Sequence, residues 1–136
     1  IGPAGKLLDT IIQRATRDRQ YRIAFTNLVC CIPLDEEGDS KLAQPPKLAI
    51  DACRPRLRQF VELAKPKLLV CTGALAERWI PKAIVGLAIR TVAITHPAAI
   101  LRANIAMQGL MKQRVEVILT NALEELSSGH RDNCTV

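Results

Sequence analysis

Two short apolar runs that each lead to one polar side chain constrain the fold of this chain most strongly. The first, Tyr21 to Val29, carries Asn27 near its end, and the second, Val92 to Thr95, is followed directly by His96. Each run has the pattern of a buried strand. In a parallel α/β sheet, ligands bind at the carboxyl ends of the strands. The sequence therefore predicts that Asn27 and His96 lie at a binding edge.

The other elements follow from hydrophobic periodicity. Apolar residues at helical spacing predict helices over residues 5–18 and 47–64, a short helix after Gly73, and a last helix with Met111, Val115, Ile118, Ala122 and Leu126 on its apolar stripe, ending near Gly129. A middle strand is expected over Lys67 to Cys71. The alternation predicts an α/β fold with three α/β/α layers and a short parallel central sheet. We expect one domain over residues 1–129, a loop over 35–46 and a disordered tail over 130–136.

Size and charge narrow the function classes. The 136 residues are 49% hydrophobic but only 3% aromatic, which fits an aliphatic core of helices packed on a parallel sheet. The net charge of +6 favours an anionic partner such as DNA or RNA, although charge alone equally fits a soluble surface. No apolar run approaches the roughly 18 residues of a membrane span. Five cysteines without a secretory signal favour a reducing compartment, and metal binding over disulfides.

Five motifs in order resemble one family. They are IGPAGKLLD (1–9), TNLVCCIP (26–33), IDACRPRL (50–57), PKLLVCTGALA (66–76) and THPAAILR (95–102). Together they resemble the uracil-DNA glycosylase superfamily, most closely its family 4 branch of iron–sulfur enzymes. In that family a first strand and a Gly-Glu-x-Pro-Gly loop, which positions the attacking water, precede these motifs. Since the chain opens with a loop and a helix, we expect both to lie upstream of Ile1, so that the first strand is missing here.

The resemblance assigns roles to Asn27 and His96. An Asn amide offers a donor and an acceptor side by side, which match O4 and N3–H of uracil, whereas cytosine presents the opposite pattern. A His at the O2 atom of the departing uracil would stabilise the negative charge that develops there. The structural alternatives are a turn-capping Asn and a buried His satisfied by backbone groups. With the flanking motifs, we favour base recognition by Asn27 and catalysis by His96.

Four further residues are interpreted as DNA contacts. Leu101 could fill the space that a flipped base leaves in the stack, and Arg102 could contact phosphate. The alternative, a core Leu and a surface Arg, is equally open. The loop from Gly2 to Gly5 could bind a phosphate on free backbone N–H groups, or could simply lead into the helix. A group of four arginines, at positions 14, 17, 19 and 22, is interpreted as a solvated basic face that could help dock DNA.

The cysteines fit the family only in part. Cys31 and Cys53 fall where the family places two of the four ligands of a [4Fe–4S] cluster. Its other two ligands belong to the upstream segment, so we expect a cluster in a full-length parent and no stable cluster in this chain alone. Cys30 is a poor substitute because neighbouring residues rarely both reach one iron. Cys71 lies within a predicted strand and is expected to be a buried hydrophobic residue.

The resemblance therefore implies a DNA repair glycosylase that hydrolyses the N-glycosidic bond of uracil in DNA. Its partner would be uracil-containing DNA, and it would act as a monomer in a bacterial, archaeal or phage-infected cytoplasm, without a membrane. A non-catalytic DNA- or protein-binding relative, lacking the water-activating loop, is the main alternative. A small cysteine-based metal module with Cys30, Cys31 and Cys53 is a third, although their spacing matches no zinc pattern.

Overall fold

The computed structural model describes residues 2–17, 19–31 and 44–128. In these ranges the elements follow the order α1 (Pro3–Thr16), α2 (Lys47–Ala64), β1 (Leu68–Thr72), α3 (Ala74–Ala83), β2 (Arg90–Ile94), α4 (Pro97–Arg102) and α5 (Ile105–Ser128). Strands β1 and β2 pair in parallel, from Leu68 opposite Arg90 to Thr72 opposite Ile94. The crossover through α3 gives a βαβ unit. The predicted α/β fold is confirmed, with a short parallel sheet of two strands in the described residues.

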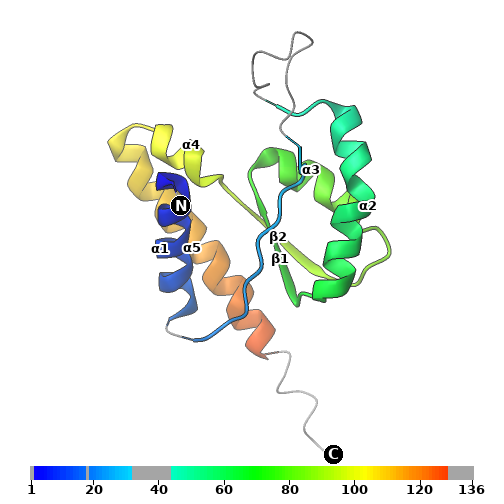
Figure 1. The fold of residues 1–136 in the computed structure, drawn as a ribbon. Coiled ribbons are helices and arrows are strands. Elements are labelled where there is room, and N and C mark those ends of the chain that lie inside the picture. The colour runs from blue at the N-terminus through cyan, green and yellow to red at the C-terminus, as the bar shows by residue number, and fades with distance from the viewer. Residues whose placement is uncertain (1, 18, 32–43, 129–136) are drawn as a thin grey trace, which may run out of the picture.

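Helices cover both faces of this sheet (Figure 1). Helices α1, α4 and α5 lie together on one side, and α2 and α3 lie on the other. Side chains alternate along each strand, as a pleated strand requires. Thus Val70 and Ile94 pack toward α1 and α5, whereas Leu69 and Cys71 pack toward α2 and α3. The three layers follow from this alternation.

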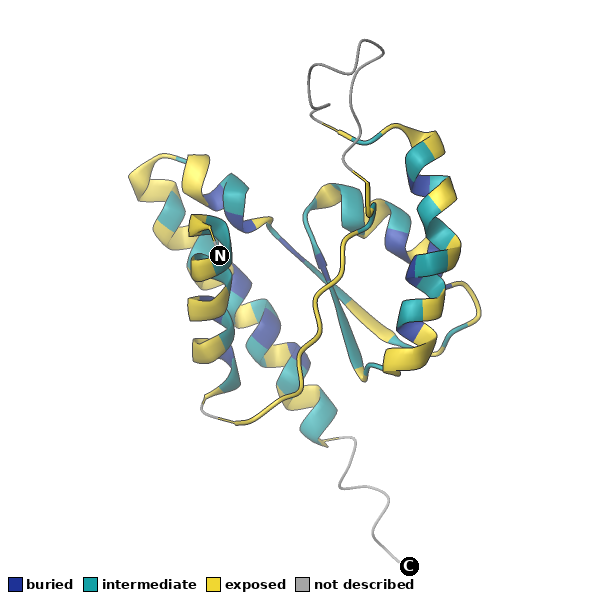
Figure 2. Cartoon of the chain, in the orientation of Figure 1, coloured by how far each residue is buried: buried dark blue, intermediate teal, exposed yellow. Residues whose placement is uncertain are grey.

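Two hydrophobic clusters hold the layers together. The first joins α1, α4, α5 and β2 and consists of Ile11, Ala15, Ile94, Ile100, Val115 and Leu119. The second joins α2, α3 and β1 and consists of Leu57, Val61, Cys71, Ile80, Ala83 and Ile84. Figure 2 shows buried positions on the helices on both sides of the sheet. We call them the α5 cluster and the α2 cluster. Cys71 is 3% exposed, which confirms it as a buried hydrophobic residue.

The strand predicted over Tyr21 to Val29 is wrong for the described residues. The segment is extended but pairs with neither strand of the sheet, and most of it is exposed (Figure 2). Ile23 and Phe25 are 51% and 65% exposed. An apolar run becomes a strand only where an adjacent strand shares backbone hydrogen bonds with it, and neither β1 nor β2 does so for this segment.

Smaller boundary predictions differ as well. The first helix begins at Pro3 rather than at residue 5, because proline is favoured in the first turn, where its missing N–H costs nothing. The stretch after His96 forms the short helix α4, which the hydrophobic periodicity does not indicate. Most of the predicted 35–46 loop and the whole predicted disordered tail lie outside the described residues.

No helix among the described residues is long and apolar enough to cross a membrane.

Candidate functional site

The carboxyl edge of the sheet brings two chain segments together. The parallel pairing continues one residue beyond β1, because the backbone N–H of Gly73 donates to the carbonyl oxygen of Ile94 at 2.8 Å. Gly73 then begins α3, while Thr95 and His96 lead from β2 into α4. The residue after β1 and the residue that caps α4 therefore lie against each other at this edge.

His96 is the N-cap of α4, and its ring is held by that role. The backbone N–H of Ala98 donates to Nδ1 of His96 at 3.1 Å. A neutral imidazole has one acceptor nitrogen and one N–H donor. Because Nδ1 accepts here, the proton of the neutral ring lies on Nε2. The side chain is exposed, so Nε2–H is available to a ligand at the edge.

Because Gly73 has no side chain, the His96 side chain can lie directly beside its backbone. Its φ of +90° and ψ of 161° belong to a backbone region that essentially only glycine adopts. A Cβ on Gly73 would lie 3.1 Å from Cβ of His96 and 3.6 Å from its Cδ2. Any larger residue would therefore be strained and would also push against the histidine. The sequence indicates Gly73 as a turn but not as a neighbour of His96.

Asn27 lies in the extended segment that runs toward α2. Its backbone carbonyl oxygen accepts a hydrogen bond from Nη2 of Arg56 at 2.6 Å. The next residue, Leu28, packs against the α2 cluster, which includes Cys71 near the end of β1. Asn27 is exposed, and within the described ranges its side-chain amide has no hydrogen-bond partner. The amide is thus neither a turn cap nor committed to another side chain of those ranges.

Leu101 and Arg102 lie in the last turn of α4. Leu101 is 38% exposed, whereas its neighbour Ile100 is fully buried in the α5 cluster. The apolar residue that anchors this helix to the core is therefore Ile100, and Leu101 projects from it. Arg102 is exposed and, over the ranges the structure describes, forms no ion pair.

The predicted glycine loop is mostly helical. Gly2 is the N-cap of α1, and Gly5 lies within the first turn of the helix. A Cβ on Gly2 would meet no atom within 4 Å, so its surroundings are open. The backbone N–H groups of the first turn remain, but the predicted loop from Gly2 to Gly5 is wrong, because the helix begins at Pro3.

The structure also brings two cysteine-bearing segments together. The backbone N–H of Cys30 donates to Sγ of Cys53 at 3.5 Å. Cys30 and Cys31 are exposed, and Cys53 is half-buried. A [4Fe–4S] cluster takes four thiolates. No group of three or more His, Cys, Asp or Glu side chains suited to a metal occurs among the described residues, so these residues alone do not fit a complete cluster.

The predicted basic face is largely paired within the molecule. Nη1 of Arg17 lies 3.1 Å from Oε1 of Glu124, and Nη1 of Arg14 lies 4.0 Å from Oε2 of Glu116. Arg19 donates to Oγ of Ser127 at 3.2 Å. Three of the four arginines thus contact α5. They link α1 and the residues that follow it to α5, and the charges of Arg14 and Arg17 are partly neutralised there.

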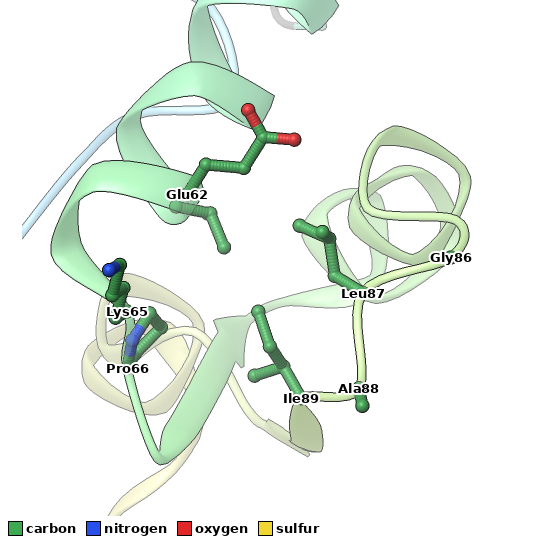
Figure 3. A pocket seen from close by; sticks show the side chains of 8 residues that line it. Glu62, Lys65, Pro66, Gly86, Leu87, Ala88 and Ile89 are labelled. Carbon is green, nitrogen blue, oxygen red and sulfur yellow. The ribbon is translucent and has the colours of Figure 1, made fainter.

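A surface hollow of about 410 Å³ lies at the opposite end of the sheet (Figure 3). Its lining includes Lys65 and Pro66, just before β1, and Leu87 to Ile89, just before β2. These residues precede the strands, whereas His96 follows them. The hollow is therefore separate from the edge that carries His96.

The sequence does not indicate that Arg56 is a neighbour of Asn27. The two residues lie 29 positions apart, and their contact arises only when α2 packs beside the extended segment. The spacing of residues carries no signal for such a contact.

Comparison with known families now identifies the class. The sequence profile of the uracil DNA glycosylase superfamily matches residues 1–123. This covers most of the 136 residues, and the chain belongs to that superfamily. A search of curated proteins found no match to the chain. Superfamily members act on DNA, and this fits the net positive charge. The closer likeness to family 4 stays a prediction from the motifs.

Proposed function

We propose that this chain hydrolyses the N-glycosidic bond of uracil in DNA. The observation that carries the proposal is the geometry of His96, an exposed imidazole at the carboxyl edge of the sheet whose Nδ1 accepts from the Ala98 N–H. Membership of the superfamily supports the same reaction class. No residue of the described ranges is assigned to activation of the attacking water.

His96 would act at the departing base. When the glycosidic bond breaks, the electron pair stays with uracil, and negative charge develops on its O2. A donor fixed beside that oxygen stabilises the charge as it forms, and one such donor is worth roughly 2.7–4 kcal/mol. Nε2–H of His96 can be this donor because the cap hydrogen bond occupies Nδ1. The ring needs no reorientation during the reaction, since α4 already holds it.

Asn27 would recognise the base before cleavage. Its amide presents N–H to O4 of uracil and its oxygen to N3–H. Cytosine places a donor and a bare acceptor at these positions, so it would leave two polar groups unpaired. Two observations support this role. The side-chain amide of Asn27 has no hydrogen-bond partner among the described residues, and its backbone carbonyl is held by the hydrogen bond from Arg56.

DNA contacts would come from α4 and from the start of α1. Extruding a base costs a few kcal/mol, and an apolar side chain that fills the vacated stack offsets part of that cost. Leu101 is the exposed apolar side chain on α4, and Arg102 beside it can contact phosphate. Gly2 and Gly5 offer backbone N–H groups at the start of α1, where negative charge is favoured.

Excision from a single-uracil oligonucleotide tests the proposal. The protein is mixed in excess with labelled DNA, abasic sites are cleaved, and the product is quantified over time. Matched oligonucleotides with thymine or cytosine at the same position are the controls. We expect product only with uracil. DNA binding without any excision would reject the proposed reaction and would instead support the non-catalytic DNA-binding relative.

We further propose that Cys31 and Cys53 are two ligands of a [4Fe–4S] cluster in a longer protein that supplies two more thiolates. The approach of Cys53 to the backbone of Cys30 supports this, because it brings the two segments within reach of one group. Iron content and visible absorbance of such a protein are the measurements. Cys31→Ser and Cys53→Ser should lose both signals, and Cys71→Ser should keep them. Iron retained by the first two variants would reject the ligand assignment.

A further inference from the structure

Arg56 makes a two-point contact with the segment that carries Asn27. Nη2 donates to the carbonyl oxygen of Asn27 at 2.6 Å, and Nη1 donates to Oγ1 of Thr26 at 3.2 Å. The two acceptors belong to consecutive residues, so one planar guanidinium spans both. Nε of Arg56 is buried and has no hydrogen-bond partner among the described residues. Both terminal nitrogens of the guanidinium therefore bind this segment, while its Nε is left unpaired among the described residues.

The contact with Arg56 constrains a segment that no strand pairing holds in place. A strand residue is oriented by hydrogen bonds to a neighbouring strand, but residues 21–29 pair with neither β1 nor β2. A hydrogen bond to the carbonyl of Asn27 fixes the peptide plane that follows its Cα, and hence limits the direction of its side chain. The backbone of α2 is held in place at Arg56, because the next residue, Leu57, is buried in the α2 cluster.

We propose that Arg56 is a positioning residue for base recognition, which holds the backbone of Asn27 so that its amide faces the base in one orientation. This inference rests on the proposed function, since it assigns Asn27 to the uracil edge. Arginine suits the task better than lysine, because its rigid fork meets two acceptors at once, whereas an ammonium meets them less specifically. Arg56 does not touch the base and acts through Asn27.

The chain offers a matched control on the same helix. Arg58 also donates to a distant backbone carbonyl, that of Val85, at 2.8 Å, and its Nε lies 2.9 Å from Glu62. Arg58→Ala therefore removes a comparable contact between α2 and a different segment, the connection between α3 and β2. If arginines of α2 serve only stability, Arg56→Ala and Arg58→Ala should behave alike.

The first measurement does not need activity. Backbone order parameters of residues 26–28 are measured by NMR relaxation for the parent, Arg56→Ala, Arg56→Lys and Arg58→Ala. A rigid backbone gives values of about 0.85, and a flexible one gives values below about 0.6. We expect the loss of order in Arg56→Ala alone, with Arg56→Lys between it and the parent. Unchanged order in Arg56→Ala would overturn the proposal.

The second measurement is excision. We expect Arg56→Ala to lower kcat/KM for uracil about ten-fold, mainly through KM, because a mobile Asn27 binds the base less often in the right orientation. Arg56→Lys should recover part of the loss, and Arg58→Ala should keep the parental value below its melting temperature. Equal losses in both alanine variants would overturn the positioning role. If the parent itself excises no uracil, the proposed function fails, and the order parameters still decide whether Arg56 holds Asn27.

Discussion

His96 and Asn27 are held in place by two different kinds of contact. His96 follows the paired strand β2, caps a helix through the amide two residues later, and packs on Gly73 at the end of the adjacent strand. Asn27 lies in an unpaired extended segment, and its backbone depends on an arginine 29 positions away. The proposed catalytic group is fixed by local structure, and the proposed recognition group by a tertiary contact.

This contrast has an energetic meaning. A short-range cap forms as soon as α4 forms, whereas a long-range contact lasts only while α2 and the segment stay packed. Regions with few buried contacts and exposed backbone open at a lower free energy than core strands. We therefore expect the position of Asn27 to be more sensitive to distant changes than that of His96.

The largest expected effect belongs to His96→Ala. Single-turnover excision should fall on the order of 10²–10³, because one donor to the developing charge is lost. DNA affinity should change little, because the contact strengthens only as charge develops, whereas the thermal midpoint should fall modestly, because loss of the helix cap costs about 0.5–2 kcal/mol. Parental excision by this variant would falsify the catalytic assignment. A parallel loss of rate, affinity and stability would show instead that His96 supports the fold.

Asn27→Asp should have the next largest effect. The carboxylate keeps an acceptor for N3–H but loses the donor to O4 and places negative charge beside that oxygen. An unpaired polar group costs about 1–3 kcal/mol, which corresponds to roughly 10–10² in rate. The thermal midpoint should stay near the parental value because the side chain is exposed. Excision close to the parental rate would remove Asn27 from the base pocket.

Gly73→Ala tests whether the sheet edge fixes His96. The required backbone conformation is nearly closed to alanine, which costs on the order of 1–3 kcal/mol of stability. The new methyl group would also press on His96, so excision should slow even well below the melting temperature.

Gly86→Ala is the matched control for that substitution. Gly86 also has a positive φ, of +83°, but an added Cβ would meet no atom within 4 Å. The Gly86→Ala variant should be less stable than the parent but should keep the parental rate of uracil excision per folded molecule. If the two alanine variants lose only stability, the contact between Gly73 and His96 has no role in the reaction.

The smallest expected effect concerns the thiol of Cys71. Burial, and to a lesser extent Glu77, raise the pKa of this thiol above its ordinary value. The folded chain therefore holds the proton more tightly than the unfolded chain. As the pH rises past the usual cysteine pKa of about 8.5, the unfolded thiol ionises first, and the free energy of unfolding falls.

Thiol labelling near the usual cysteine pKa compares the reactivity of Cys71 in the sheet with that of Cys30 and Cys31 at the end of the extended segment. Mass spectrometry with site assignment should find Cys30 and Cys31 modified first, because both are exposed, and Cys71 modified last. A slope of stability against pH near this pKa should disappear in Cys71→Ala. Equal labelling of Cys71 and Cys31 would show that the sheet opens as readily as the extended segment.

Most of the fold could be predicted from the sequence because it depends on local patterns. Residues 47–64 carry a helical stripe, and β1 and α3 are separated by a glycine that ends the strand, so their approximate bounds follow from spacing. His96 could be predicted for the same reason, since it directly follows a short apolar run. The fold class and the superfamily are confirmed.

What could not be predicted depends on contacts between distant residues. The segment over 21–29 has a strand-like pattern, yet a strand also requires a partner, and no local pattern records whether one is available. The contacts of Arg56 with Asn27 and of Gly73 with His96 arise from packing of α2 and from strand register. The ion pairs of Arg14 and Arg17 with α5 are equally invisible in the order of residues. The roles of the predicted site residues stay predictions.

The pairing of α1 with α5 has a consequence for the ionic-strength dependence of DNA binding. Each phosphate that a cationic side chain neutralises releases condensed counterions and adds about 0.9 to the slope of log affinity against log salt for duplex DNA. Arg17 must first give up Glu124 before it can contribute, whereas Arg102 has no ion pair among the described residues. The slope should therefore reflect cations such as Arg102 that have no ion pair among the described residues, rather than all 19 Lys and Arg side chains of the chain.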